Sequence, residues 1–247
     1  MKKHAAVALV AMAVSGLSLL SAQAPAGQPA GGAQDHVAAL KQNLAQGQAA
    51  IRKYEWVETT AISMKGEEKS RKMNRAYYGA DGKVQKVPMG QPQQAQQDSG
   101  GRGGGRRGGR AAERIIENKV DEITDYMERA GALIQSYVPP DPARIQPAKE
   151  GGKVAVQPQA GGRVRIVVSD YLQPGDALTV DLDPAANRLV GLGVNTYLDE
   201  KSETVTLAVQ LNTLPDGAFF AAQTTLDVKA KEIRVVVQNS GHKPMTK

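Results

Sequence analysis

The amino-acid sequence predicts an α+β fold: a curved antiparallel sheet, a half-barrel of about ten strands, with one long helix and one or two shorter helices on its apolar face. Two patterns carry this prediction. Between Arg163 and Gln238, short runs of alternating apolar and polar residues are separated by turn residues, which is typical of a meander with one buried and one wet face. Before this region, apolar residues recur at intervals of four and three between Ile116 and Tyr137, as on one stripe of a helix.

The chain before the long helix supplies further elements. Asp35 can cap a first helix, whose apolar positions continue to Ile51. Residues 54–78 alternate on both sides of a Lys-Gly turn and predict a hairpin, and a short third strand over 83–89 is stopped by Pro88. The second arm of the hairpin carries basic residues on both faces, which favours an edge strand over a basic binding surface.

The long helix provides the cover that a one-sided sheet needs. Pro139-Pro140 ends it, and Asp141-Pro142 begins a short helical segment. The same stripe would suit a coiled-coil seam, but no second long helix accompanies it, so packing on the sheet is favoured.

Composition limits the kind of protein this can be. A chain of 247 residues can form one domain with a continuous apolar core. Hydrophobic residues make up 41% of the chain but aromatic residues only 4%, so the core must consist mainly of Val, Leu, Ile and Ala. The sequence has no cysteine, and its stability therefore has to come from that core and not from disulfides.

The N-terminus follows the secretory pattern. Two lysines precede an apolar run from Ala5 to Leu20, and small residues follow. The run is shorter than the roughly 20 residues that a membrane-spanning helix needs. We therefore expect residues 1–24 to be a signal peptide and not a membrane anchor. We expect a disordered leader over 25–34, a single domain over 35–247, and a periplasmic or secreted location.

A segment rich in Gln, Gly and Arg interrupts the domain at residues 90–110. It has no apolar residues to offset the entropy of ordering, so we expect a disordered insertion. Its arginines Arg102, Arg106, Arg107 and Arg110 could contact an anionic membrane surface or cell-surface polymer, or simply keep a linker soluble. No aromatic residue lies between them to stack on bases, and export argues against a nucleic-acid partner.

The residues that usually carry catalysis are poorly placed. The histidines are His4 in the signal peptide, His36 at a helix start and His242 in the C-terminal tail, which argues against zinc or a Ser-His-Asp arrangement. Asp181 and Asp183 share a strand face but fit a solvated turn better than a cation site. Carboxylates that a glycosidase could use lie beside turns or on the polar face: Asp170, Asp181, Asp199 and Glu203. We therefore expect no enzymatic activity, no metal and no cofactor.

The order of elements and several local segments resemble known exported proteins. The order is helix, three strands, long helix, then six or seven strands. It resembles the periplasmic lipoprotein carrier (LolA/LolB-like) superfamily, which implies a curved sheet holding helices and a hydrophobic ligand. Four segments are similar to a group of uncharacterised exported bacterial proteins: 78–83, 136–142, 195–199 and 214–217. Neither resemblance implies catalytic residues.

These observations lead to a functional expectation. The protein should be a monomeric, non-catalytic binding or carrier module for an apolar ligand, a lipid or lipoprotein acyl chain, held between sheet and helices. The expected ligand-lining residues are Trp56, Ile62, Ile123, Met127, Ile134, Leu192 and Leu207. The alternative is a structural or interaction protein whose sheet and long helix fill each other completely.

Overall fold

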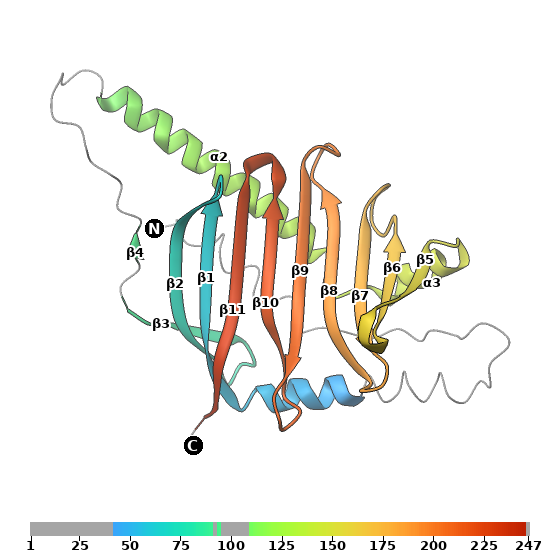
Figure 1. The fold of residues 1–247 in the computed structure, drawn as a ribbon. Helices are drawn as coiled ribbons and strands as arrows, with labels where there is room; N and C mark the ends of the chain where they lie inside the picture. Colours follow the sequence, from blue (N-terminus) through green and yellow to red (C-terminus); the bar gives the residue numbers. More distant parts are fainter. Residues whose placement is uncertain (1–41, 91–92, 95–108, 246–247) are drawn as a thin grey trace.

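One open antiparallel sheet forms the centre of the protein. The computed structural model describes residues 42–90, 93–94 and 109–245. Eleven strands form the sheet, ten of them in the order β3-β2-β1-β11-β10-β9-β8-β7-β6-β5, while β4 pairs with β2 (Figure 1). Their bounds are β1 (Tyr54–Met64), β2 (Glu67–Tyr78), β3 (Val84–Pro88), β4 (Gln93–Gln94), β5 (Val154–Pro158), β6 (Val164–Ser169), β7 (Ala177–Asp183), β8 (Arg188–Tyr197), β9 (Thr204–Thr213), β10 (Phe219–Val228) and β11 (Ile233–Pro244).

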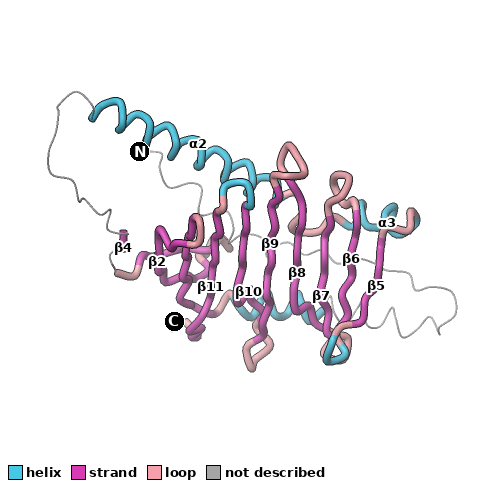
Figure 2. The backbone as a smooth tube through the Cα atoms, turned by 45° about the horizontal axis from the view of Figure 1, so that its top comes forward, coloured by secondary structure: helices cyan, strands magenta, loops and turns pink. Residues whose placement is uncertain are grey.

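Three α-helices accompany the sheet in the described part of the chain: residues 42–51, α2 (Gly109–Gln135) and α3 (Pro142–Glu150). Short 3-10 turns are η2 (Ala160–Gly162) and η3 (Lys229–Lys231). In Figures 1 and 2, α2 runs along one end of the strands and the helix of residues 42–51 along the opposite end. This arrangement confirms the predicted α+β fold with one long and two shorter helices.

The alternating pattern of the sequence decides which face of the sheet is covered. Val205, Leu207 and Val209 of β9 are buried and share one face, which we call the inner face. Leu207 pairs with Leu226 of β10 on one side and Val194 of β8 on the other. Because directly opposite residues point to the same face, the apolar positions of successive strands form one continuous layer.

Both ends of this layer are covered by helices. Tyr126, Ala130 and Ile134 of α2 belong to the same buried cluster as the β9 residues. Leu44, from the helix of residues 42–51, packs in a second cluster with Phe219. The predicted stripe of the long helix therefore packs on the sheet, as expected.

Two sequence expectations need correction. The second hairpin arm, now β2, is not an edge strand, because β3 and the short β4 pair along its outer side. Its charges are compatible with this position because they find local partners, such as the Arg71–Glu68 ion pair at 2.6 Å. His242 does not lie in a tail, because β11 continues to Pro244. A strand can continue through polar residues when its neighbour supplies the hydrogen bonds, and β1 pairs with β11 as far as that proline.

Several predictions fall on parts of the chain outside the described residues. These are the signal peptide, the leader, the cap at Asp35, and most of the insertion, including Arg102, Arg106 and Arg107. Within the predicted insertion, Gln93–Gln94 forms β4, and Arg110 belongs to the first turn of α2. Across the described ranges, we find no helix that is both long and apolar enough to cross a membrane.

A buried polar network fixes the end of α2 to the sheet. The Tyr137 hydroxyl hydrogen-bonds to the carboxylate of Asp176 and lies 2.7 Å from the Thr196 hydroxyl. Asp176 also accepts the backbone N–H groups of Tyr171 at 2.5 Å, Leu172 at 3.0 Å and Gln173 at 2.9 Å. Burial, followed by the hydrogen bond to Asp176, raises the pKa of Tyr137 well above its usual range. Because all these buried groups have partners, the network stabilises one position of the helix end.

Candidate functional site

The structure brings six of the seven expected ligand-lining residues to one interface, between α2 and the inner face. Ile134, Leu192 and Leu207 are buried members of its core, and three others pack against that core without full burial: Ile62, Ile123 and Met127. The seventh residue, Trp56, contacts a different pocket, which is described below.

Burial changes along α2. Tyr126, Ala130 and Ile134 are buried, whereas Ile123 and Met127, on either side of Tyr126, are half-buried. In Figure 1 the helix continues beyond this region and projects past β2. We use the name open patch for the half-buried apolar residues at this end of the interface: Ile62, Met64, Ile123 and Met127. Each of them keeps apolar surface that the helix and sheet leave uncovered.

The inner face becomes polar next to the open patch. Across the β1–β2 pair, Thr60 lies opposite Lys72 and Glu58 lies opposite Asn74. Ala76 of β2 lies opposite Lys86 of β3. We call these inner-face polar residues the polar stripe: Glu58, Thr60, Lys72, Asn74 and Lys86. The apolar layer of β5 to β11 therefore does not extend to β2 and β3.

An ion pair lies within this stripe. Lys86 Nζ is 2.7 Å from Glu58 Oε1, and the Glu58 side chain is only 3% exposed. Burying a carboxylate is costly unless a cation and hydrogen bonds compensate its charge. Lys86 is therefore needed to stabilise the buried Glu58 carboxylate. Sequence reasoning missed Glu58, although strict alternation along β1 places it on the same face as Trp56 and Thr60.

Trp56 lies in a small aromatic pocket at the other end of β1. Its indole N–H donates to Asn239 Oδ1 at 3.0 Å, and its ring is 5.6 Å from that of Tyr78 and 5.9 Å from that of His242. The pocket has a volume of about 70 Å³ and is also lined by Ile51 of the first described helix. Trp56 therefore anchors this helix to the sheet and does not extend the interface under α2.

His242, which the sequence placed in a C-terminal tail, also lines this pocket. Its ring centroid lies 3.9 Å from that of Phe220, and its Nε2 is buried without a hydrogen-bond partner among the described residues. Burial lowers the pKa of this imidazole, because the charged form is poorly solvated there. The pairing of β1 with β11 is irregular here, and Gly241 in β11 has a φ of 63°. His242 lies against Trp56 at this irregularity.

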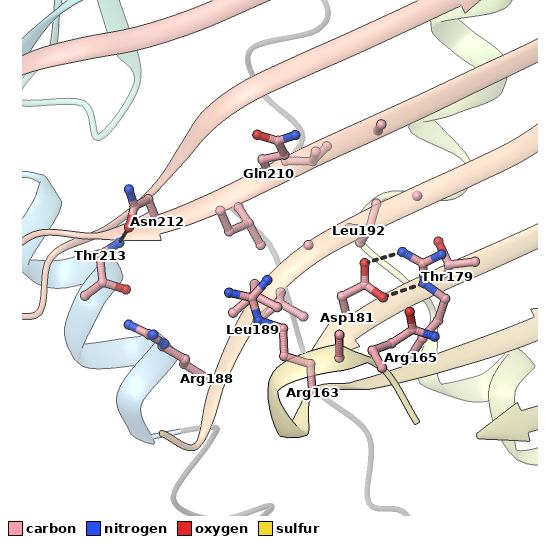
Figure 3. Close-up of a pocket in the computed structure, with 18 residues that line it drawn as sticks. Arg163, Arg165, Thr179, Asp181, Arg188, Leu189, Leu192, Gln210, Asn212 and Thr213 are labelled. Carbon is pink, nitrogen blue, oxygen red and sulfur yellow. Dashed lines mark hydrogen bonds and ion pairs between the residues drawn. The ribbon is translucent and has the colours of Figure 1, made fainter. Parts of the chain in front are cut away.

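A larger hollow, of about 750 Å³, lies over β7, β8 and β9 on the face of the sheet opposite the inner face (Figure 3). Gly191 and Gly193 leave room there for neighbouring side chains, since a Cβ at Gly193 would come within 2.4 Å of Thr179 Oγ1. Arg165 forms a two-fold ion pair with Asp181, with Nε–Oδ1 at 2.7 Å and Nη2–Oδ2 at 2.8 Å. Other polar residues lining the hollow are Gln159, Arg163, Arg188, Gln210, Asn212 and Thr213. This charged lining distinguishes it from the apolar interface under α2.

Three of the four carboxylates considered for catalysis, Asp181 with Arg165 among them, form separate ion pairs, while Glu203 accepts the backbone N–H of Asp199 at 3.0 Å. Asp199 pairs with Arg129 at 2.5 Å, and Asp170 with Lys153 at 3.3 Å. Asp183 is 3.4 Å from Arg188. Within residues 42–90, 93–94 and 109–245, His, Asp and Glu side chains form no group of three or more that could hold a metal ion.

Comparison with known proteins gives little further information. No family model matches the chain, and no curated protein matches it. A crystal structure of a DUF1329 family protein from Desulfovibrio piger aligns with a TM-score of 0.31 and 8% identity, over 84% of this chain and 92% of that one. This likeness is too weak to assign a family or a function.

Proposed function

We propose that the protein is an exported, non-catalytic binding or carrier module. Its ligand would be a lipid or a lipoprotein acyl chain, and the apolar part of that ligand would lie against the open patch, between α2 and the inner face. This is the function that the expected resemblance to lipoprotein carriers also implies.

The incomplete burial of the open patch is the observation that supports the proposal. A helix stripe that only served to fill a core would be expected to be buried along its whole contact with the sheet. Instead, Met127 and Ile123 are half-buried, although Tyr126 between them is buried. Methionine is a suitable residue for such a surface, because its flexible thioether adapts to ligands of different outline.

A specific observation also favours the alternative, a structural or interaction protein with a filled core. Ala130 and Tyr137 are fully buried, and the network around Asp176 fixes this end of the helix. The two functions therefore differ in what they predict for the open patch.

Binding of a fluorescent fatty acid to the purified protein tests the proposal. Met127→Ala should weaken binding about tenfold, because part of the apolar surface that contacts the chain is lost. Met73→Ala is the matched control: Met73 is an exposed methionine of β2 that lies opposite Thr59, on the other face of the sheet. Its replacement should leave the affinity unchanged.

The outcomes separate the two functions. If the wild-type protein binds no fatty acid, or if both methionine variants bind as the wild type does, the carrier proposal is wrong. A filled core would then be the remaining explanation of the α2 interface.

A further inference from the structure

The polar stripe contains one more cation than anion. Lys72 and Lys86 are its basic residues and Glu58 its acidic residue. Lys86 and Glu58 neutralise each other at 2.7 Å. Lys72 forms no ion pair within the part of the chain that the structure describes. One positive charge on the inner face is thus left without a countercharge from the described residues.

Lys72 is close to the open patch. It lies directly opposite Thr60, and Ile62 is the next residue of β1 on the same face. Diagonal neighbours of this kind in an antiparallel pair have Cα atoms about 7–8 Å apart, within reach of a lysine side chain. The Lys72 residue is half-buried, as expected where the apolar stem of a lysine lies along a protein surface.

The three other basic residues of β2 are in a different situation, because each pairs with a glutamate; Lys69 lies 2.5 Å from Glu67. Arg71 and Arg75 of the same strand lie opposite Ala61 and Val57, and both pair with glutamates, at 2.6 Å to Glu68 and 3.8 Å to Glu55. Lys72 is therefore the basic residue of β2 that combines an inner-face position with a free positive charge.

We propose that Lys72 binds the acidic head group of the ligand, a carboxylate or phosphate, while the acyl chain lies against the open patch. This inference rests on the proposed function and narrows its ligand class to acidic amphiphiles. An ammonium group on a flexible stem provides a point charge with three donors, which suits either kind of head group. A neutral lipid would leave the charge of Lys72 uncompensated.

Two probes with the same chain test this inference: a fluorescent fatty acid and its methyl ester. The wild-type protein should bind the acid about tenfold more tightly than the ester, as expected for one charge-assisted hydrogen bond. Lys72→Gln should reduce that preference to about one, and Lys72→Arg, which keeps the charge, should retain most of it. Lys83→Gln, at an exposed lysine of the β2–β3 turn, should leave the preference unchanged.

Each failure has a distinct meaning. Equal binding of acid and ester by the wild type would overturn the head-group inference and leave the carrier function standing. No binding of either probe would overturn both. A Lys72→Gln variant that loses affinity for both probes equally would show that Lys72 acts through packing, which also overturns the inference. Acetate, which lacks the chain, should not bind measurably; binding as tight as that of the fatty acid would identify a plain anion site instead.

Discussion

The two halves of the inner face are built in different ways. Under the end of α2, apolar residues of β7 to β10 form a filled core, and Tyr137, Asp176 and Thr196 satisfy one another within it. Towards β1 and β2, the residues of the open patch are half-buried and the neighbouring positions are polar. The first half fixes the helix, and the second half leaves surface that a ligand could cover. Shortening a side chain in the filled half should therefore lower the free energy of unfolding more than the same change in the open half.

The largest loss of stability is expected for a change at Asp176, the carboxylate at the centre of the hydrogen-bond network in the filled half. Asp176→Ala should lower the free energy of unfolding by more than about 4 kcal/mol, because three backbone N–H groups and the Tyr137 hydroxyl lose their acceptor. Chemical denaturation measures this loss. Asp183→Ala is the matched control, since that carboxylate accepts the Ala186 N–H in an exposed turn. Similar losses of unfolding free energy for both variants would mean that the Asp176 network contributes no more stability than a carboxylate in an exposed turn.

A smaller effect should separate the two halves directly. Ile134→Ala, in the filled half, should cost about 2–5 kcal/mol of unfolding free energy, as large-to-small changes in packed cores do. Ile123→Ala makes the same chemical change in the open patch and should cost less than half as much, because less contact surface is lost. Equal losses at the two positions would contradict the division of the interface and favour a core that is filled along the whole helix.

The smallest effect concerns the aromatic pocket at the other end of β1. Burial lowers the pKa of His242 in the folded protein below its ordinary value of about 6.5. The neutral imidazole therefore contributes stability that is complete above about pH 6.5 and is lost as the pH falls towards the folded-state pKa. Below that value the unfolded and folded states both bind the proton, and the loss is complete.

His242→Phe removes this titrating group but keeps a ring against Trp56 and Phe220. Between about pH 7.5 and pH 5, the melting temperature of the wild type should fall by a few degrees more than that of the variant. His242 is the only histidine among residues 42–90, 93–94 and 109–245, so the difference can be assigned to it. Parallel curves for the two proteins would contradict a destabilising protonation at this site.

The sequence predicted those parts of the structure that depend on local periodicity. Alternation placed Leu192 and Leu207 on the inner face, and intervals of three and four placed Ile134 of α2 against the sheet. It could not show that Ile123 and Met127 would be less buried than Ile134, because the spacing is the same along the whole stripe. That difference depends on where the helix lies relative to the edge of the sheet.

Sequence reasoning misplaced three residues for the same reason: a local pattern does not show which strands pair or how far the pairing extends. Trp56 was grouped with the α2 interface because it alternates in phase with Ile62, yet one strand is long enough to reach two separate sites. His242 looked like part of a tail because its neighbours are polar, although pairing with β1 continues to Pro244. The basic residues of β2, Lys72 among them, predict an edge strand, and only the pairing of β3 and β4 with β2 shows otherwise.

The sequence by itself determined the fold class, the inner face of each strand and the stripe of the long helix, because these follow from side-chain periods of 2 and 3.6 residues along a single element. The tertiary structure decided which inner-face residues are covered, which charge meets which countercharge, and where the apolar layer gives way to Glu58, Lys72 and Lys86. Those properties depend on strand order and register, which join residues far apart in the chain. Local patterns cannot specify them, because a strand with the same alternation can pair at the centre of a sheet or beside its edge.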